Sequence, residues 1–345
     1  MRPAIGLLAI PLLAVVAHAE APRKEAPRKS GADPAAISER ATMLAPIQID
    51  SLTLTPIVAT GAGGKEVDVL VLDQGMAAKL VKIKEKVDSE DVNNLTLINN
   101  SDKPLFVLAG EVIIGGKQDR IIGKNTVIPA KTTQSVPVFC VEHGRWDNSS
   151  KEFTTARALA HGRLRGQASF AAQQDVWNEV NAKNKVRGTS NDTDTYRKVA
   201  KQQQDGSMKQ WMTKVDGALA KIPAADRARM IGYAVALNGK VATVDMFQSP
   251  GLFKKLEPKL VQSYVTDAVD IKASKNVKAP TAADVKEFIA DAEKAAIERS
   301  YETKAAKTTI SNGKRAAKAK VTLDFSGNVA NPSPPATVYE NYQAK

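Results

Sequence analysis

The chain has 345 residues, of which 43% are hydrophobic and 5% aromatic, so it is long enough to bury a sizeable and mostly aliphatic core. Its single cysteine, Cys140, excludes an intramolecular disulfide, so packing has to supply the stability. The formal net charge of +12 favours anionic partners, but the lysines are scattered and no nucleic-acid-binding motif occurs. We therefore expect no specific nucleic acid as a partner.

The N-terminus has the pattern of a secretory signal. Arg2 precedes the apolar stretch 4–16, which is followed by the small-residue pattern Ala-His-Ala. The apolar stretch is interrupted by Pro11 and is too short to cross a bilayer comfortably. Residues 1–19 are therefore predicted to be a cleaved signal peptide of an exported protein, either periplasmic or secreted, with no membrane span.

The segment that follows, residues 20–45, has the composition of a disordered linker. The unit EAPRK occurs twice in tandem, and a segment so rich in Pro, Ala and charge cannot bury an apolar face. Residues 46–327 are expected to form a single domain, and residues 328–345 a loose tail.

The first half of this domain, residues 46–146, is predicted to be rich in strands. Apolar or alternating runs are separated by Gly, Asn, Pro and Ser, which favour turns. These runs are 47–60, 67–73, 81–87, 94–100, 103–114, 119–128 and 135–142. A short helix is expected over 73–81, and the short connections favour mainly antiparallel pairing.

The second half is predicted to be mainly helical with one hairpin. Helical spacing of apolar residues occurs over 157–186, 207–222, 252–269 and 283–300. Asn238-Gly239 joins two alternating runs, which predicts a β-hairpin with a type I′ turn. The expected fold class is α+β, with a largely antiparallel, β-rich N-terminal half packed with C-terminal helices and a β-hairpin.

The last three predicted strands of the first half bring polar residues to one rim. In an antiparallel meander the first and third strands run the same way, so their C-terminal ends share a rim with the start of the middle strand. We expect this rim to gather Glu111, the GGKQDR segment of 115–120 and the CVEHGRW segment of 140–146.

Two interpretations of this rim are open. In one, Glu111–Arg120 and Glu142–Arg145 are ion pairs that only tie the sheet together. In the other, the rim is a pocket whose cationic side chains hold an anion through charge-assisted hydrogen bonds, with an indole as a stacking wall. The ligand-binding residues predicted in this way are Lys117, Gln118, Arg120, Arg145 and Trp146.

A catalytic version of the site assigns acid–base roles to three residues. Glu111 or Glu142 is the candidate general base, and His143 the candidate acid or base. Cys140 lies within an apolar strand pattern, which favours a core thiol over a nucleophile. The histidines lack a close pair and no phosphate-binding loop or dinucleotide fingerprint occurs, so neither a metal ion nor a cofactor is expected.

The stretch 106–146 resembles the core signature of the ARG and rhodanese-phosphatase-superfamily-associated protein domain family. Members carry L-x-G-E, then G-x-K-Q-[ND]-R and P-V-x-C-V-E-x-G-R-W, matched here at 108–111, 115–120 and 137–146. The resemblance covers about residues 46–325. By association it implies a nucleotide- or ADP-ribose-related role, which agrees with an arginine-lined anion site.

The expected function is binding of an anionic small molecule or a modified protein at the rim by an exported protein. Nucleotides, ADP-ribose-like molecules and phosphorylated molecules are the ligand classes considered. One alternative is a hydrolase acting on such a substrate. The other is a basic structural protein of the envelope, held to anionic polymers by its charge.

Overall fold

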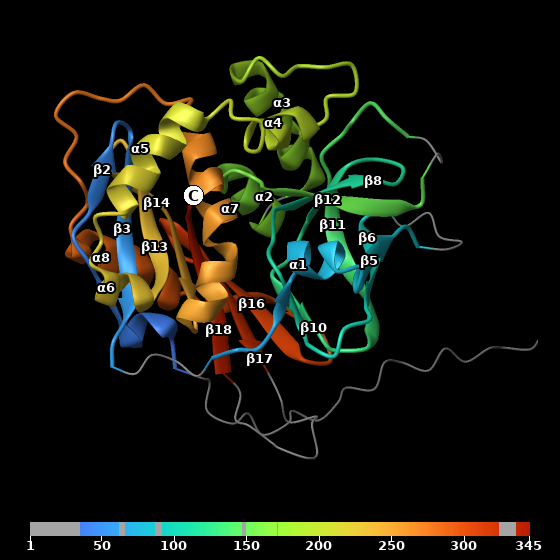
Figure 1. The fold of residues 1–345 in the computed structure, drawn as a ribbon, viewed down its shortest axis with the longest axis horizontal. Coiled ribbons are helices and arrows are strands. Elements are labelled where there is room, and N and C mark those ends of the chain that lie inside the picture. Colours follow the sequence, from blue (N-terminus) through green and yellow to red (C-terminus); the bar gives the residue numbers. More distant parts are fainter. Residues whose placement is uncertain (1–34, 62–65, 87–91, 147–149, 171, 324–335) are drawn as a thin grey trace, which may run out of the picture. The chain divides into compact units, whose positions relative to one another are not determined.

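The described part of the chain is built around a long antiparallel sheet and a closed barrel (Figure 1). All of it lies in one unit, residues 34–345. The computed structural model describes residues 35–61, 66–86, 92–146, 150–170, 172–323 and 336–345.

Within these residues, nine strands form the long sheet, in the order β1-β3-β13-β14-β18-β17-β16-β15, with β2 paired to β3. Neighbouring strands are antiparallel throughout. Their bounds are β1 Ala41–Met43, β2 Ile47–Ile49, β3 Leu52–Ala59, β13 Met230–Leu237, β14 Lys240–Phe247, β15 Ile297–Glu302, β16 Ala306–Asn312, β17 Ala316–Leu323 and β18 Ala336–Ala344. The sheet therefore joins strands from the beginning, the middle and the end of the chain.

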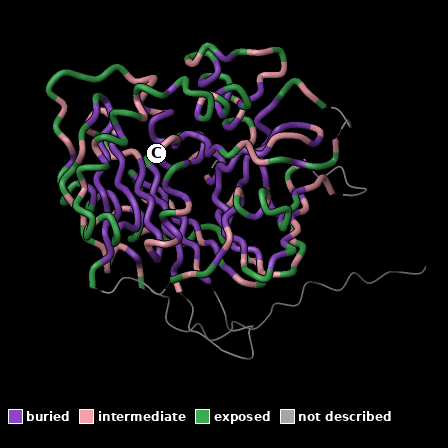
Figure 2. The backbone as a smooth tube through the Cα atoms, in the orientation of Figure 1, coloured by how far each residue is buried: buried purple, intermediate pink, exposed green. Residues whose placement is uncertain are grey.

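Helices cover both faces of this sheet. Helices α7 (Pro250–Ala268) and α5 (Lys209–Leu219) pack on one face. Helix α8 (Ala282–Glu293) and the 3₁₀ turn η1 (Ile37–Arg40) pack on the other. Every residue of β3 is consequently buried, and the strands of the sheet are mostly buried in Figure 2. A sheet covered on both faces needs apolar residues at consecutive positions, not only at alternate ones.

Local sequence signals account for several boundaries. The φ angles of Asn238 and Gly239 are 45° and 78°, as a type I′ turn requires, so the predicted hairpin β13–β14 is confirmed. Helix α7 begins after Ser249, whose hydroxyl accepts a hydrogen bond from the Leu252 amide. Thr281 and Asp284 form a capping box at the start of α8.

Six of the described strands close into a barrel, in the order β11-β6-β5-β12-β8-β9. Their bounds are β5 Val81–Lys84, β6 Asn94–Asn99, β8 Glu111–Gly115, β9 Arg120–Ile122, β11 Thr132–Cys140 and β12 Glu152–Leu159. Aliphatic side chains and Phe153 fill its interior. A small sheet beside it, in the order β10-β7-β4, contains the parallel pair β4–β7. The bounds of these strands and of helix α1 are β4 Leu70–Val71, α1 Leu72–Ala77, β7 Leu105–Val107 and β10 Thr126–Ile128.

The remaining helices follow the barrel strands in the chain. Helices α2, α3 and α4 pack apolar side chains against the outer side of β8, β9 and β12. Their bounds, and that of α6, are α2 Gly162–Phe170, α3 Gln173–Val186, α4 Arg197–Gln202 and α6 Ala224–Ala228. In the described part of the chain no helix is both long and apolar enough to cross a bilayer.

The α+β class with a β-rich first half is confirmed, but the strand divisions differ from the prediction. The run 103–114 is two strands, β7 and β8, because the chain turns at Gly110. Gly110 has a φ of +88°, and a Cβ there would stand 2.5 Å from the Cγ of Arg165. The run 119–128 is likewise divided into β9 and β10, and β12 was not predicted.

Both ends of the predicted domain were placed too far inward. Residues 37–43, expected in the linker, form η1 and β1, and Ile37 is fully buried against α8. Residues 336–344, expected in a loose tail, form β18, which pairs with both β14 and β17. Burial of Tyr339 and Tyr342 in the two cores stabilises β18. The predicted signal peptide lies outside the described residues.

Candidate functional site

The predicted directions of the three rim strands are confirmed. Strand β9 pairs antiparallel with both β8 and β11, so β8 and β11 run the same way. The end of β8, the start of β9 and the end of β11 therefore meet at one rim of the barrel.

Asp119, directly before β9, is the centre of this rim and is fully buried. Its carboxylate accepts hydrogen bonds from the Gly115 amide (3.1 Å) and the Thr195 hydroxyl (2.7 Å). It also accepts from Nε and Nη2 of Arg197, at 2.9 and 2.6 Å, and from Nη2 of Arg145 at 3.4 Å. Asp119 thus connects β9 to the turn before it and to the segment leading into α4.

Glu142 is the second buried carboxylate of the rim. It accepts hydrogen bonds from the Asp119 amide (2.9 Å) and the Thr193 hydroxyl (2.9 Å). Nε of Arg145 donates to it at 3.0 Å, so the predicted Glu142–Arg145 ion pair is confirmed. We call Asp119, Glu142, Arg145, Thr193, Thr195 and Arg197 the rim cluster.

The charges of the rim cluster balance. Two carboxylates face two guanidinium groups, and every carboxylate oxygen accepts at least one hydrogen bond. Hydrogen bonding to Asp119 raises the pKa of Arg197 above its ordinary value. Hydrogen bonds to Glu142 and Asp119 hold the two arginines in position. The side chain of Arg197 is nevertheless 47% exposed and that of Arg145 21%.

Glu111 does not join this rim, contrary to the prediction. Because the chain turns at Gly110, Glu111 begins β8 instead of ending a strand, which places it about 13 Å from the rim at about 3.3 Å per residue. Its carboxylate accepts a hydrogen bond from Nζ of Lys259 at 2.5 Å and from the Leu108 amide at 2.9 Å. Lys259 also contacts Asp73 at 2.7 Å. Glu111 thus belongs to a separate buried cluster between β8, α1 and α7.

Arg120 is also placed differently from the prediction. Its guanidinium forms no ion pair with Glu111 and is fully buried. Nη1 donates to Oε1 of Gln118 at 3.1 Å and to the Asp119 carbonyl at 3.4 Å. Cys140 lies opposite Arg120 in the ladder and is buried, as the apolar strand pattern predicted. Burial raises the pKa of the Cys140 thiol, and Arg120 opposes that effect.

Three predicted site residues lie on the outside of the rim, where His143 and Trp146 are exposed and Lys117 is half-buried. The ammonium of Lys117 lies 4.9 Å from the centre of the Trp146 ring, and Trp146 is 54% exposed. The ring of His143 packs edge-on against Trp177 at 4.6 Å. Gln118, by contrast, is buried with Arg120. The predicted binding residues are thus divided between an outer group and a buried pair.

The sequence did not single out Asp119, Thr193, Thr195 or Arg197 as site residues. Asp119 lies within the GGKQDR segment, but its role as a buried hydrogen-bond acceptor depends on Thr195 and Arg197, which are distant in the sequence. The segment GTSNDTDT, 188–195, has the composition of a polar loop before a helix. The signal for a site in this segment was its high content of hydroxyl and amide side chains, because such side chains can form hydrogen bonds with buried charged groups.

We expect Asp119→Asn to lower the free energy of unfolding by about 2–3 kcal/mol, because it leaves two arginines short of a buried counter-charge. Urea denaturation measures the change. The control is Asp50→Asn, whose partner Lys214 and own side chain are 56% and 46% exposed, with an expected cost of about 0–1 kcal/mol. Equal costs for the two variants would contradict a structural role of Asp119.

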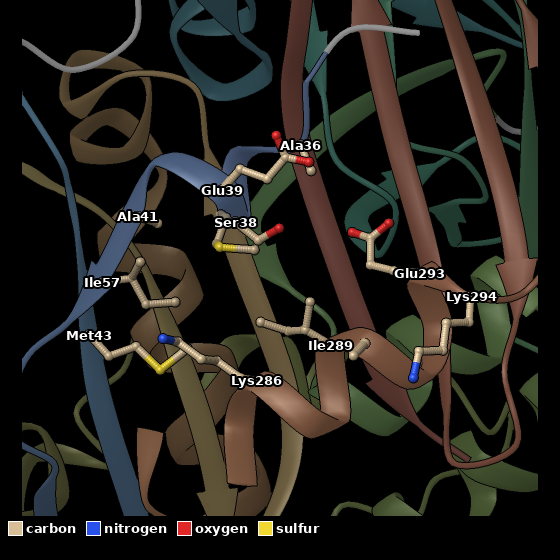
Figure 3. A pocket seen from close by; sticks show the side chains of 12 residues that line it. Ala36, Ser38, Glu39, Ala41, Met43, Ile57, Lys286, Ile289, Glu293 and Lys294 are labelled. Atoms are coloured by element: carbon tan, nitrogen blue, oxygen red, sulfur yellow. The ribbon is translucent and has the colours of Figure 1, made fainter. Parts of the chain in front are cut away.

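A pocket of about 380 Å³ lies away from the rim, between η1, β1 and α8 (Figure 3). Its apolar lining includes Ile57, Met246 and Ile289, and Glu39 and Lys286 are among its polar lining residues. Residues predicted as site residues from the sequence do not line it.

Comparison with known proteins agrees with the signature in the sequence. The family model of the ARG and rhodanese-phosphatase-superfamily-associated protein domain matches residues 40–331. No curated protein and no solved structure matches the chain. The matched region contains the whole barrel and the rim cluster. The chain therefore belongs to the ARG and rhodanese-phosphatase-superfamily-associated protein domain family.

Proposed function

We propose that this is an exported protein that binds an anionic ligand, such as a nucleotide, an ADP-ribose-like molecule or another phosphorylated molecule, at the outer rim. The outer rim is the group Lys117, Arg145, Trp146 and Arg197. The observation that carries the proposal is the contact of the Lys117 ammonium with an indole that is 54% exposed. An exposed indole beside a cation suits a flat ring that carries a phosphate.

The two arginines support the same ligand class. Both are bonded to buried carboxylates, and Arg197 is the more open of the two, because Arg145 also donates to the Gly115 and Gly116 carbonyls. Side chains held in this way lose little conformational entropy when they bind an anion. The donors are side chains and not the glycine amides, since the Gly115 and Gly116 amides already donate to Asp119 and to the Glu152 carbonyl.

We expect Lys117→Ala and Trp146→Ala each to weaken ligand binding about tenfold, equal to about 1.4 kcal/mol. ADP-ribose, inorganic phosphate and uncharged adenosine are the probes, titrated by calorimetry and checked by thermal shift, because a ligand of the folded state raises Tm. The matched control is Lys214→Ala, which removes a lysine that lies 5.7 Å from the ring of Trp211.

The control variant should bind as the wild type does. If none of the probes shifts Tm, or if Lys117→Ala and Lys214→Ala weaken binding equally, the outer rim is not a specific site. In that second case overall positive charge explains the binding, and a basic envelope protein becomes the better description. Its binding to anionic polymers would then disappear at moderate salt.

A hydrolase acting on the same ligands is the alternative, with Glu142 and His143 as acid–base groups. It has less support, because Glu142 already accepts hydrogen bonds from Arg145, Thr193 and the Asp119 amide. Release of ribose 5-phosphate or phosphate by the wild type, lost in His143→Ala with folding intact, would favour the hydrolase.

A further inference from the structure

Among the described residues, two arginines are almost completely buried, and they differ in their partners. Arg165 donates to both oxygens of Asp245, at 2.9 and 3.2 Å, and to the Tyr339 hydroxyl at 2.9 Å. Arg120 forms no ion pair with a carboxylate of the described residues, and its Nε and Nη2 are buried without a hydrogen-bond partner. A buried charge without a counter-charge costs several kcal/mol, so these two nitrogens mark a missing acceptor.

The strand register places these nitrogens beside the thiol of the chain's single cysteine. Cys140 and Arg120 are directly opposite in the antiparallel pair β11–β9. Opposite residues point to the same face, with Cβ atoms about 4.5–5.5 Å apart. Ile122 and Val138 of the same two strands pack in the barrel core, and residues two apart share a face. Arg120 and Cys140 therefore both point into the barrel.

No carboxylate of the described residues forms an ion pair with Arg120. The thiol of Cys140 is a neutral group at ordinary pH, since burial raises its pKa. Glu85 is close enough to act on the same thiol, but its Oε1 accepts a hydrogen bond from the Lys117 amide.

We propose that Cys140 is an oxidation site, at which a peroxide converts the thiol to a sulfenate whose oxygen is held by Nε and Nη2 of Arg120. The thiolate form of Cys140, which the charge of Arg120 favours, attacks one peroxide oxygen, so an S–O bond forms as the O–O bond breaks. The displaced hydroxide takes up the proton that the thiol released and leaves as water. Sulfur loses an electron pair and the peroxide gains it. The sulfenic acid then releases its proton to solvent, and the product carries the negative charge that Arg120 lacks.

The test treats the folded full-length protein with hydrogen peroxide, removes the peroxide, and then unfolds the protein in dimedone, which traps the sulfenic acid once the buried sulfur is accessible. Cys140 is the only cysteine, so every adduct reports this position. We expect labelling of the wild type and at least tenfold less in Arg120→Lys and Arg120→Gln, because neither side chain supplies the planar pair of donors. The matched control is Arg315→Gln, a surface arginine that pairs with Glu287, and it should label as the wild type does.

A second measurement does not depend on how well the Arg120 variants fold. Peroxide should raise the Tm of the wild type, since the sulfenate supplies a buried counter-charge. Cys140→Ala should show no rise, which also controls for oxidation of the seven methionines.

Two results would overturn the proposal. One is labelling only when the peroxide is added to the already denatured protein, which would make Cys140 an inert core thiol. The other is a rise in the Tm of Cys140→Ala with inorganic phosphate or chloride that is absent in Arg120→Gln. The open donors of Arg120 would then serve a free anion. Neither result bears on the outer rim, which is tested with other variants.

Discussion

Replacing Arg165 by methionine is expected to lower the free energy of unfolding by about 3–5 kcal/mol, because it leaves the buried Asp245 without its counter-charge. Burial alone would raise the pKa of Asp245, but its ion pair with Arg165 keeps that pKa below the ordinary value. Asp245 also accepts hydrogen bonds from the hydroxyls of Tyr264, at 2.6 Å, and Tyr339. The cluster thus joins α2, β14, α7 and β18 at one point.

Urea denaturation of Arg165→Met and of the double variant Arg165→Met/Asp245→Asn measures this effect. The double variant should recover part of the loss, because the uncompensated charge is gone. Arg315→Met is the control, since Arg315 and Glu287 are 56% and 68% exposed and their pair contributes about 0–1 kcal/mol. A loss no larger than that of the control would show that the buried pair does not stabilise the fold.

Replacing Lys259 by methionine is expected to cost about 3–5 kcal/mol at neutral pH, and the cost should depend on pH. Lys259 is buried in α7 and is the cation that faces Glu111 and Asp73. Methionine fits a similar volume but leaves the Glu111 carboxylate charged in an apolar surrounding.

The direction of the pH dependence follows from Glu111. Burial raises the pKa of Glu111 above its ordinary value, and Lys259 opposes that shift. A raised pKa in the folded state means stability that is present at low pH and is lost as pH rises through the folded pKa. Without Lys259 the pKa of Glu111 rises further. The deficit of the variant should therefore be largest at neutral and alkaline pH and shrink in mild acid, where Glu111 takes up a proton.

Urea denaturation over about pH 5 to 8 checks this expectation. Lys307→Met is the control, because Lys307 and Glu302 are 52% and 62% exposed and the variant should lose little at any pH. A deficit in Lys259→Met that stays constant across this range would mean that Glu111 does not carry an uncompensated charge there.

Features that depend on neighbours in the chain were predictable from the sequence. The Asn238-Gly239 turn, the Ser249 cap of α7 and the Glu142–Arg145 pair each involve residues at most three apart. The directions of β8, β9 and β11 followed from their short connections. Each of these features depends on local backbone conformation or on contacts between residues that are close in the chain. Such features can be inferred from the order of the residues alone.

Partners of buried charges could not be predicted in the same way. Asp119 and Arg197 are 78 positions apart, and Glu111 and Lys259 are 148 apart. The prediction paired Glu111 with Arg120 because it treated 103–114 as one strand, whereas the turn at Gly110 moved Glu111 to the opposite end of β8. One such turn changes every long-range neighbour of a side chain.

The sequence by itself determined the fold class, the hairpin, the caps of α7 and α8, and the strand directions that form the rim, because these depend on periodicity and short-range hydrogen bonds. Only the tertiary structure decided that residues 336–344 complete the long sheet, that Arg120 points into the barrel, and which carboxylate each buried cation meets. Those outcomes depend on which distant segments the sheet order brings together, and burial of apolar surface across the whole unit selects that order.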